Sequence, residues 1–472
     1  MGSANFIKSG IWYTVGNILI KGISFIALPL FTRLLSPEDF GKYNVFLSYE
    51  NILNVILGLG LSGTIKVAFF DYKEDFNKYF SSIVSLTVIS TILFDLMANL
   101  LILILFRNSM PSFWDTGLIN LLICSSLATA LYSLISTKYV IEAKYRSNLA
   151  ISFLYTITNV VLSVLLCLTI FTAHRYLARI LGQTLPLILL TFGIGVFYIR
   201  KYRNIFNYSY WHYSLKLGLP LILHMLSMVL LMQIGKLQID YFLGSSATGI
   251  YSVAVTIASI LTILLGSFDN AWAPWFYRGL AGEEGINLKK GNNKISAFFA
   301  FATAVFILVS PELVKIMAAA EYQEAIYSLI PLIIAVFVNF MYLFAVNQEY
   351  YYKKTKTIAF GTVVATITCI SINYFFIPVC GYVTAAFADL IGKGVLYIIH
   401  TYVVRKLKKQ PVVSNKLLMV LLLALCLISV VTVLCRDIIF VRILIVIVLC
   451  AIALRPVQQF IMEHRKQQNI KL

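Results

Sequence analysis

The sequence predicts an all-α protein that crosses a membrane about fourteen times. Three observations indicate this class: 60% of the 472 residues are hydrophobic, only 12% are charged, and the mean hydropathy is +0.86. A helix needs roughly 20 apolar residues to cross the hydrocarbon core of a bilayer, so a chain of this length with short connections holds about fourteen spans. Little of the sequence remains for a soluble domain.

The individual spans follow from the apolar runs and from the polar or basic residues that interrupt them. The first run is too long for the apolar core of a signal peptide and no small-residue cleavage site follows it, so we expect it to remain as the first span. The expected spans are 11–32, 42–65, 80–106, 117–137, 149–172, 177–199, 216–236, 247–272, 295–311, 326–348, 357–377, 382–403, 416–434 and 438–455.

Lysine and arginine residues gather on one side of these spans. The loops on the side of the N-terminus hold 27 of the 38 basic residues and the opposite loops hold nine, while Lys21 and Lys393 fall inside spans. Cytoplasmic loops carry such an excess, so we expect both termini in the cytoplasm. The net charge of +18 is thus a topology signal. Nucleic acid is not an expected partner, because the basic residues form neither one face nor one long run.

The sequence also repeats itself at an offset of 208 residues, with eleven identities over positions 8–58 that include Gly41/Gly249 and Tyr43/Tyr251. Matches of glycine, lysine and tyrosine are harder to obtain by chance than matches of leucine. Parallel repeats are a known transporter architecture with the substrate path between the halves. The expected domains are an N-lobe of six spans, a cytoplasmic interfacial linker, a C-lobe of six spans, and two extra spans with a cytoplasmic tail: 1–199, 200–215, 216–403 and 404–472.

The linker allows two interpretations. It is rich in Arg, Lys, Tyr and Trp, and such a segment can lie in the headgroup layer of the membrane. An ordinary basic loop would have the same composition.

The segment Phe31-Thr-Arg-Leu-Leu-Ser-Pro-Glu-Asp-Phe-Gly-Lys-Tyr43 resembles the first-loop signature of the polysaccharide transporter family, and Leu243–Tyr251 resembles its counterpart in the second half. That family contains the O-antigen and capsule-unit flippases, and its superfamily includes multidrug/toxin extrusion pumps and the lipid II flippase. The resemblance implies a flippase of the bacterial inner membrane. Its cargo would be an undecaprenyl-pyrophosphate-linked oligosaccharide repeat unit for lipopolysaccharide or capsular polysaccharide, moved by alternating access. Membrane lipids and the polysaccharide polymerase machinery are the other expected partners.

Ionisable residues inside spans are candidates for the transport site, because a charged side chain at the bilayer centre costs at least about 2.5–3.5 kcal/mol and usually faces a cavity or a partner. Lys21 lies midway along the first span and Glu50 at a similar depth on the second. Lys21 could bind a pyrophosphate or an acidic sugar in a central cavity, or it could pair with Glu50. Glu50 is also a candidate for ion coupling, since a buried carboxylate can hold or release a proton as its solvation changes.

Three further ionisable residues lie inside expected spans. Asp389 and Lys393 have the spacing of an internal salt bridge, and they are also candidates for ion coupling and for the cavity, respectively. Asp95 has no partner nearby in the sequence, so it is a candidate protonation site unless its span is shifted toward the headgroups. The seventh span carries a polar stripe: His224, Gln233, Lys236, Gln238 and Asp240.

The sequence predicts no cofactor, no metal site and no enzymatic reaction. The seven cysteines lie in or beside apolar segments without a CxxC pair, and no phosphate-binding Gly-x-x-x-x-Gly-Lys-Ser/Thr motif occurs. Two alternatives stay open. A multidrug/toxin cation antiporter of the same superfamily would favour acidic residues in its cavity, whereas Lys21 favours an anionic cargo. A membrane glycosyltransferase or polymerase would be expected to carry a sizeable external loop with clustered carboxylates or arginines, and the expected external loops are short.

Overall fold

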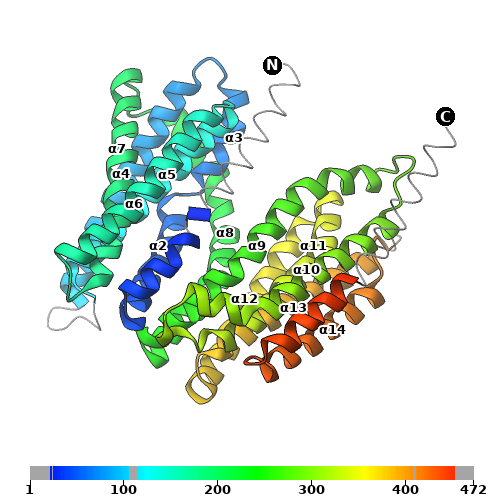
Figure 1. The fold of residues 1–472 in the computed structure, drawn as a ribbon. Coiled ribbons are helices and arrows are strands. Elements are labelled where there is room, and N and C mark those ends of the chain that lie inside the picture. Colours follow the sequence, from blue (N-terminus) through cyan, green and yellow to red (C-terminus); the bar gives the residue numbers. More distant parts are fainter. Residues whose placement is uncertain (1–21, 24, 106–113, 408–410, 452–472) are drawn as a thin grey trace, which may run out of the picture. The chain divides into compact units, whose positions relative to one another are not determined.

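A computed structural model of the chain describes residues 22–23, 25–105, 114–407 and 411–451. These residues form helices and connections, with no strand (Figure 1). The described elements are α2 (Pro37–Leu57), α3 (Leu61–Asp71), α4 (Phe76–Leu105), α5 (Thr116–Ile141), α6 (Tyr145–Thr169), α7 (Arg175–Tyr202), α8 (Tyr208–Leu243), α9 (Ser245–Leu280), α10 (Leu288–Met317), the short 3-10 helix η1 (Ala320–Tyr322), α11 (Ala325–Tyr351), α12 (Thr355–Cys380), α13 (Val383–Lys406) and α14 (Asn415–Leu434).

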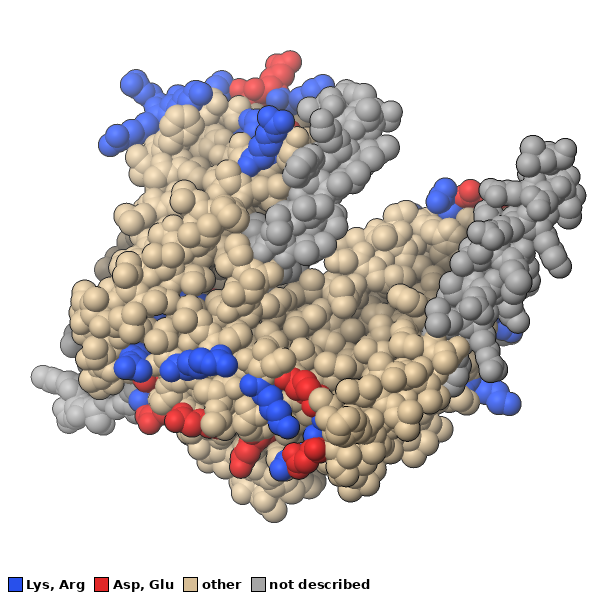
Figure 2. Space-filling model, viewed as in Figure 1, with Lys and Arg blue, Asp and Glu red and all other residues tan. Residues whose placement is uncertain are grey.

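Twelve of the described helical segments are long and apolar enough to cross a membrane, with α2 and α3 together forming one of them. They correspond one to one with the second to thirteenth expected spans. Two shorter apolar helices, Phe25–Leu34 and Ile439–Ala451, lie in the first and last expected spans and border residues outside the description. In each unit, the face in Figure 2 carries charged side chains near the helix ends and a wide uncharged band between them. The predicted all-α polytopic class is confirmed.

Local sequence signals explain where the helices begin and break. Ser36 caps α2 by accepting a hydrogen bond from the Asp39 backbone N–H, and Pro37 occupies the first helical position. α2 and α3 are separated at Gly60, which has a left-handed φ of 66°. An added Cβ at Gly60 would lie 2.5 Å from the Gly218 carbonyl oxygen, so only glycine allows α8 to approach this closely.

The internal repeat is visible in the backbone. α2 begins at Pro37 and α9 at Ser245, which is the 208-residue offset of the sequence. The turns after α5 and α11 also match: Ala143 and Lys353 have φ values of 55° and 58°. In both turns the next residue, a lysine, donates its backbone N–H at 2.8 Å to the carbonyl five residues earlier.

The chain forms two compact units, residues 1–249 and 250–472. In the first unit α5 packs on α2 and α7, α6 on α7, and α8 on α2, α3 and α4. The unit therefore includes α8, which the sequence assigned to the C-lobe. The predicted boundary at 200–215 separates the two sequence repeats, whereas the compact units meet at residues 249 and 250. The predicted lobe boundary stays a prediction.

The second half of the linker segment is attached to the protein by side-chain hydrogen bonds, while large side chains such as Phe206 and Tyr208 are exposed. α7 continues to Tyr202 and α8 starts at Tyr208, which leaves only a short connection. The Trp211 indole N–H donates to the backbone oxygen of Ser82 at 3.1 Å and to its hydroxyl at 2.9 Å. The Tyr213 hydroxyl donates to an Asp71 carboxylate oxygen at 2.5 Å. These bonds attach the start of α8 to α3 and α4.

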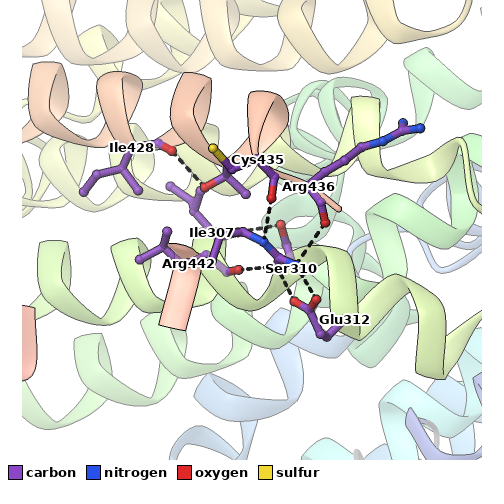
Figure 3. A network of polar contacts seen from close by, with 9 residues as sticks. Ile307, Ser310, Glu312, Ile428, Cys435, Arg436 and Arg442 are labelled. Atoms are coloured by element: carbon purple, nitrogen blue, oxygen red, sulfur yellow. Dashed lines mark hydrogen bonds and ion pairs between the residues drawn. The ribbon is translucent and has the colours of Figure 1, made fainter. Parts of the chain in front are cut away.

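In the second unit α11 packs against α10, α12, α13 and α14 and is the most buried of the candidate spans. Arg442, on the last described helix, attaches this helix to α10 (Figure 3). Its guanidinium forms a two-pronged ion pair with Glu312 and donates to the backbone oxygens of Leu308, Cys435 and Arg436. All five N–H donors of the side chain are satisfied, as burial in an apolar environment requires.

Candidate functional site

The polar centre of the first unit is built around Glu50. This residue lies on α2 and its exposed fraction is 4%. Tyr43 lies seven residues earlier, so both side chains leave α2 on one face, toward α5 and α7. A carboxylate buried among helices needs hydrogen-bond donors from its neighbours.

Three neutral donors surround the Glu50 carboxylate. Ser125 and Thr129, one turn apart on α5, donate to one oxygen at 2.9 and 2.6 Å. The Gln183 side-chain amide on α7 donates to the other oxygen at 3.2 Å. The ion pairs of the described residues do not include Glu50. Since all three donors are neutral, gain of a proton would remove the charge of this centre without breaking an ion pair among the described residues.

An arginine lies next to this network on α7. The Tyr43 hydroxyl donates to the Gln183 amide oxygen at 2.5 Å. The Arg179 guanidinium lies 4.7 Å from the centre of the Tyr43 ring and donates to Asn159 at 2.5 Å and to Ser163 at 2.9 Å. Tyr43 and Gln183 therefore lie between the cation and the carboxylate, and α2, α6 and α7 all contribute to this polar chain.

A second polar face of α2 meets α8. The Ser48 hydroxyl donates to the Gln233 amide oxygen at 3.1 Å, and the Lys236 ammonium donates to the Asn44 amide oxygen at 3.3 Å. No described carboxylate lies within 4.0 Å of the Lys236 ammonium. An ammonium in a membrane-spanning helix without a carboxylate partner is suited to an anion.

The predicted site residues fall in different places. Glu50 is at the polar centre described above, whereas Lys21 lies outside the described residues, so its pairing with Glu50 stays a prediction. Asp95 lies on α4, and one of its oxygens is buried without a hydrogen-bond partner among the described residues. No described hydrogen bond joins it to the Glu50 network. Asp389 and Lys393 form the predicted ion pair on α13 at 2.8 Å, in the second unit.

Sequence reasoning missed several polar residues that the structure brings together. Arg179 lies near the start of the expected span 177–199 and was not among the candidates; α7 starts at Arg175, so Arg179 lies inside the helix. Glu349 and His400 form a fully buried pair in the second unit. Both lie near the ends of expected spans. Glu349 is one residue beyond the span 326–348, and His400 is close to the end of the span 382–403. Polar residues at the limits of apolar runs were the available signal.

Within the described residues, no group of three or more His, Cys, Asp or Glu side chains could hold a metal ion. The arrangement provides hydrogen bonds and charged groups inside membrane-spanning helices.

The fold is that of a multi-pass membrane protein. The structure is similar to "Lipid II flippase MurJ, inward closed conformation", with a TM-score of 0.70 and 17% identity over 96% of this chain and 100% of that chain. It is also similar to an inward-facing multidrug resistance MATE family transporter of the MOP superfamily, with a TM-score of 0.62 and 14% identity over 84% of this chain and 97% of that one. At these identities the likeness shows the fold.

The family follows from the sequence comparison. The family model described as "Polysaccharide biosynthesis protein" matches residues 6–280, more than half of the chain, so the protein belongs to that family. "Lsg locus putative protein 1" of Haemophilus influenzae is 24% identical over 372 residues, which are 76% of this chain and 88% of that protein. An "Uncharacterized membrane protein" of the same organism is 22% identical over 387 residues, 77% and 88% of the two chains. The family predicted from the first loop is confirmed.

Proposed function

We propose that this protein is a flippase that moves undecaprenyl-pyrophosphate-linked oligosaccharide repeat units across the bacterial inner membrane for the assembly of a surface polysaccharide. Membership of the polysaccharide biosynthesis family and a fold shared with a lipid II flippase support this class. The observation that favours an anionic lipid-linked cargo is Lys236, an ammonium on a membrane-spanning helix with no carboxylate partner among the described residues.

Charge complementarity is the physical reason. An ammonium group at depth in a membrane is unfavourable unless an anion or dipoles compensate it. A pyrophosphate would supply that anion while the lipid tail stays in the bilayer, and the sugar unit would hydrogen-bond to side chains such as Asn44 and Gln233. Lys21 on the first span and Lys393 are further candidates for this role.

Transport would proceed by alternating access without a chemical reaction, with both termini in the cytoplasm. Energy would come from an ion gradient, the membrane potential or removal of the product, since the sequence has no nucleotide-binding motif. Glu50 is the first candidate for a coupling carboxylate because its donors are neutral; Asp95 and Asp389 are the others. A protonated Glu50 would be neutral when the solvation of its side chain changes between the inward and outward states.

The decisive experiment is deletion of the gene in its native host, followed by complementation. We expect lipid-linked repeat units to accumulate on the cytoplasmic face and surface polysaccharide to be lost, with both defects corrected by the wild-type gene. Lys236→Met should fail to complement at normal membrane abundance. Lys290→Met, which changes an exposed lysine near the start of α10, is the matched control and should complement fully.

A multidrug cation antiporter is the second candidate, because the structure is also similar to MATE transporters. The same deletion strain discriminates the two functions. An antiporter would leave polysaccharide export intact, and its loss would sensitise cells to lipophilic cations. That outcome would overturn the flippase proposal.

A further inference from the structure

The second unit contains a polar centre that joins three helices. Glu349 lies near the end of α11, Thr357 near the start of α12, and His400 near the end of α13. The distance between His400 Nδ1 and a Glu349 carboxylate oxygen is 2.6 Å, and the Thr357 hydroxyl donates to the other oxygen. The exposed fractions of the Glu349 and His400 side chains are both 0%. Neither group is in contact with water in this conformation.

The other ring nitrogen of His400 has no partner. Nε2 is buried and makes no hydrogen bond within the described part of the chain. It points at Gly361 of α12, where an added Cβ would lie 2.4 Å from Nε2. An unsatisfied polar atom in a buried position costs roughly 1–3 kcal/mol. Tight packing does not explain such a cost, so the unpartnered nitrogen indicates a functional role.

Few charged or titratable groups face this pair. From α11 the Tyr342 ring packs on the imidazole at a centroid distance of 5.1 Å, and Tyr350 lies close enough to interact electrostatically with Glu349. From α12 the neighbours are Thr357 and Gly361, which carry no charge. The pair takes part in no other ion pair of the described residues, and the two phenols are neutral near pH 7.

Two protonation states of the pair follow from this geometry. With a neutral imidazole, the Nδ1–H donates to the Glu349 carboxylate, and the centre carries one negative charge. With one more proton, on Nε2, the centre becomes an uncharged ion pair of imidazolium and carboxylate. The new Nε2–H then has no acceptor, because α12 presents only the Gly361 backbone to it. Protonation thus removes a buried net charge and creates a buried unsatisfied donor.

We propose that Glu349 and His400 form a proton-binding site of the second unit that is occupied in one stage of the transport cycle. This inference rests on the proposed transport function. Proton uptake favours separation of α12 from α13 at Gly361, since a water molecule admitted there accepts the Nε2–H. Proton release closes the contact again. The site is distinct from Glu50, which lies in the other unit.

The first test observes the proton directly in the full-length protein. ¹⁵N-histidine NMR in lipid nanodiscs resolves five histidines, and His400→Gln assigns the signal of His400. We expect the His400 signal to change between about pH 5 and about pH 9 and the change to disappear or shift in Glu349→Gln. His212→Gln, which removes an exposed histidine, is the control and should leave the His400 signal unchanged. A His400 signal in a single protonation state throughout this range overturns the proposal.

The second test measures lipid-linked oligosaccharide transport in proteoliposomes against pH. Wild-type transport should change roughly tenfold between about pH 6 and about pH 8, as expected when one proton is taken up, and His400→Gln should reduce that change to less than about twofold. Gly361→Ala should slow transport because its Cβ occupies the space at Nε2. An unchanged pH profile in His400→Gln overturns the coupling role. If the wild type does not transport this cargo while the NMR signal titrates, the proposed function fails and the proton site remains.

Discussion

The two buried carboxylates, Glu50 in the first unit and Glu349 in the second, differ in what holds them. Each joins three helices, and each receives a hydroxyl donor from a neighbouring helix. Glu50 is otherwise held by an amide, whereas Glu349 is held by an imidazole. An amide stays neutral at every physiological pH and an imidazole does not. The Glu50 carboxylate is therefore held by neutral donors alone, while the Glu349 carboxylate is held by a group that is able to carry a charge.

The turns after α5 and α11 extend this comparison. Their backbones match, but in the first unit the buried cation is Lys138, whose ammonium lies 2.5 Å from Glu142 and 4.4 Å from the centre of the Phe76 ring. A carboxylate and an aromatic ring compensate the charge of this ammonium group. The two turns thus share one backbone design, while the buried pair beside the first is a lysine with a carboxylate and the pair beside the second is a histidine with a carboxylate.

The largest effect is expected from Glu50→Leu. This substitution removes the acceptor of three donors, of which Ser125 is buried and Thr129 and Gln183 are partly buried. An unsatisfied buried donor costs roughly 1–3 kcal/mol, so we expect a loss of about 3 kcal/mol or more in the free energy of unfolding. Glu50→Gln keeps the size of the side chain and one acceptor, so it should cost much less. Thermal unfolding of the two purified variants in detergent measures both losses of stability.

Glu74→Gln, at an exposed position, serves as the control and should leave the unfolding temperature unchanged. If Glu50→Leu were as stable as this control, the Glu50 network would not hold the first unit together, and the contrast with Glu349 would lose its basis.

The second prediction concerns the glycines that the repeat places opposite each other. An added Cβ at Gly41 would lie 1.7 Å from the Ser245 carbonyl oxygen, and one at Gly249 would lie 2.0 Å from the Pro37 carbonyl oxygen. Gly41→Ala and Gly249→Ala should each cost roughly 1–3 kcal/mol, because backbone atoms cannot yield as a flexible side chain would. The double variant should cost less than the sum, since one displacement relieves both clashes.

Unfolding temperatures and transport rates of the three variants check this expectation, with Gly193→Ala as control because an added Cβ there has no atom within 4 Å. Strict additivity would contradict a single shared contact.

The fold was largely predictable because membrane spans depend on local composition. Twelve described spans match the expected ones, and the Asp389–Lys393 pair was predictable because both residues lie on one helix. The partners of Glu50 were not predictable: Ser125, Thr129 and Gln183 come from helices far away in the sequence, and hydroxyl and amide residues are common in spans. Such partners become visible only when the helices are packed.

Errors at span boundaries hid the remaining residues. Glu349 lies one residue beyond an expected span, and α11 continues to Tyr351. The helices extend past the apolar runs because their ends are satisfied by turns and caps rather than by hydrophobicity. An ionisable residue at such an end can be fully buried when neighbouring helices extend equally far, as α13 does at His400.

A smaller effect is expected from Lys138→Met. Methionine retains most of the apolar stem and its packing against Phe76, and Glu142 keeps Lys144 as a partner at 2.8 Å. We expect a loss of about 1–2 kcal/mol in the free energy of unfolding and no change in the pH dependence of transport. His400→Gln should show the opposite pattern. An altered pH profile in Lys138→Met would remove the distinction between the two turns.

The smallest effect is expected from the Asp389–Lys393 pair. The two side chains are 20% and 22% exposed, and the carboxylate lies four residues before the ammonium, the favourable order on a helix. Such a pair contributes about 0.2–0.5 kcal/mol to an isolated helix, and the interaction free energy from Asp389→Asn, Lys393→Met and the double variant should stay near this range. Thermal unfolding of the four proteins measures it. If the pair serves only the helix, the double variant transports at the wild-type rate, because the two charges are removed together and neither is left unpaired. A transport rate that falls in Lys393→Met and in the double variant alike, at unchanged stability, would instead assign the Lys393 ammonium to the path of the anionic cargo.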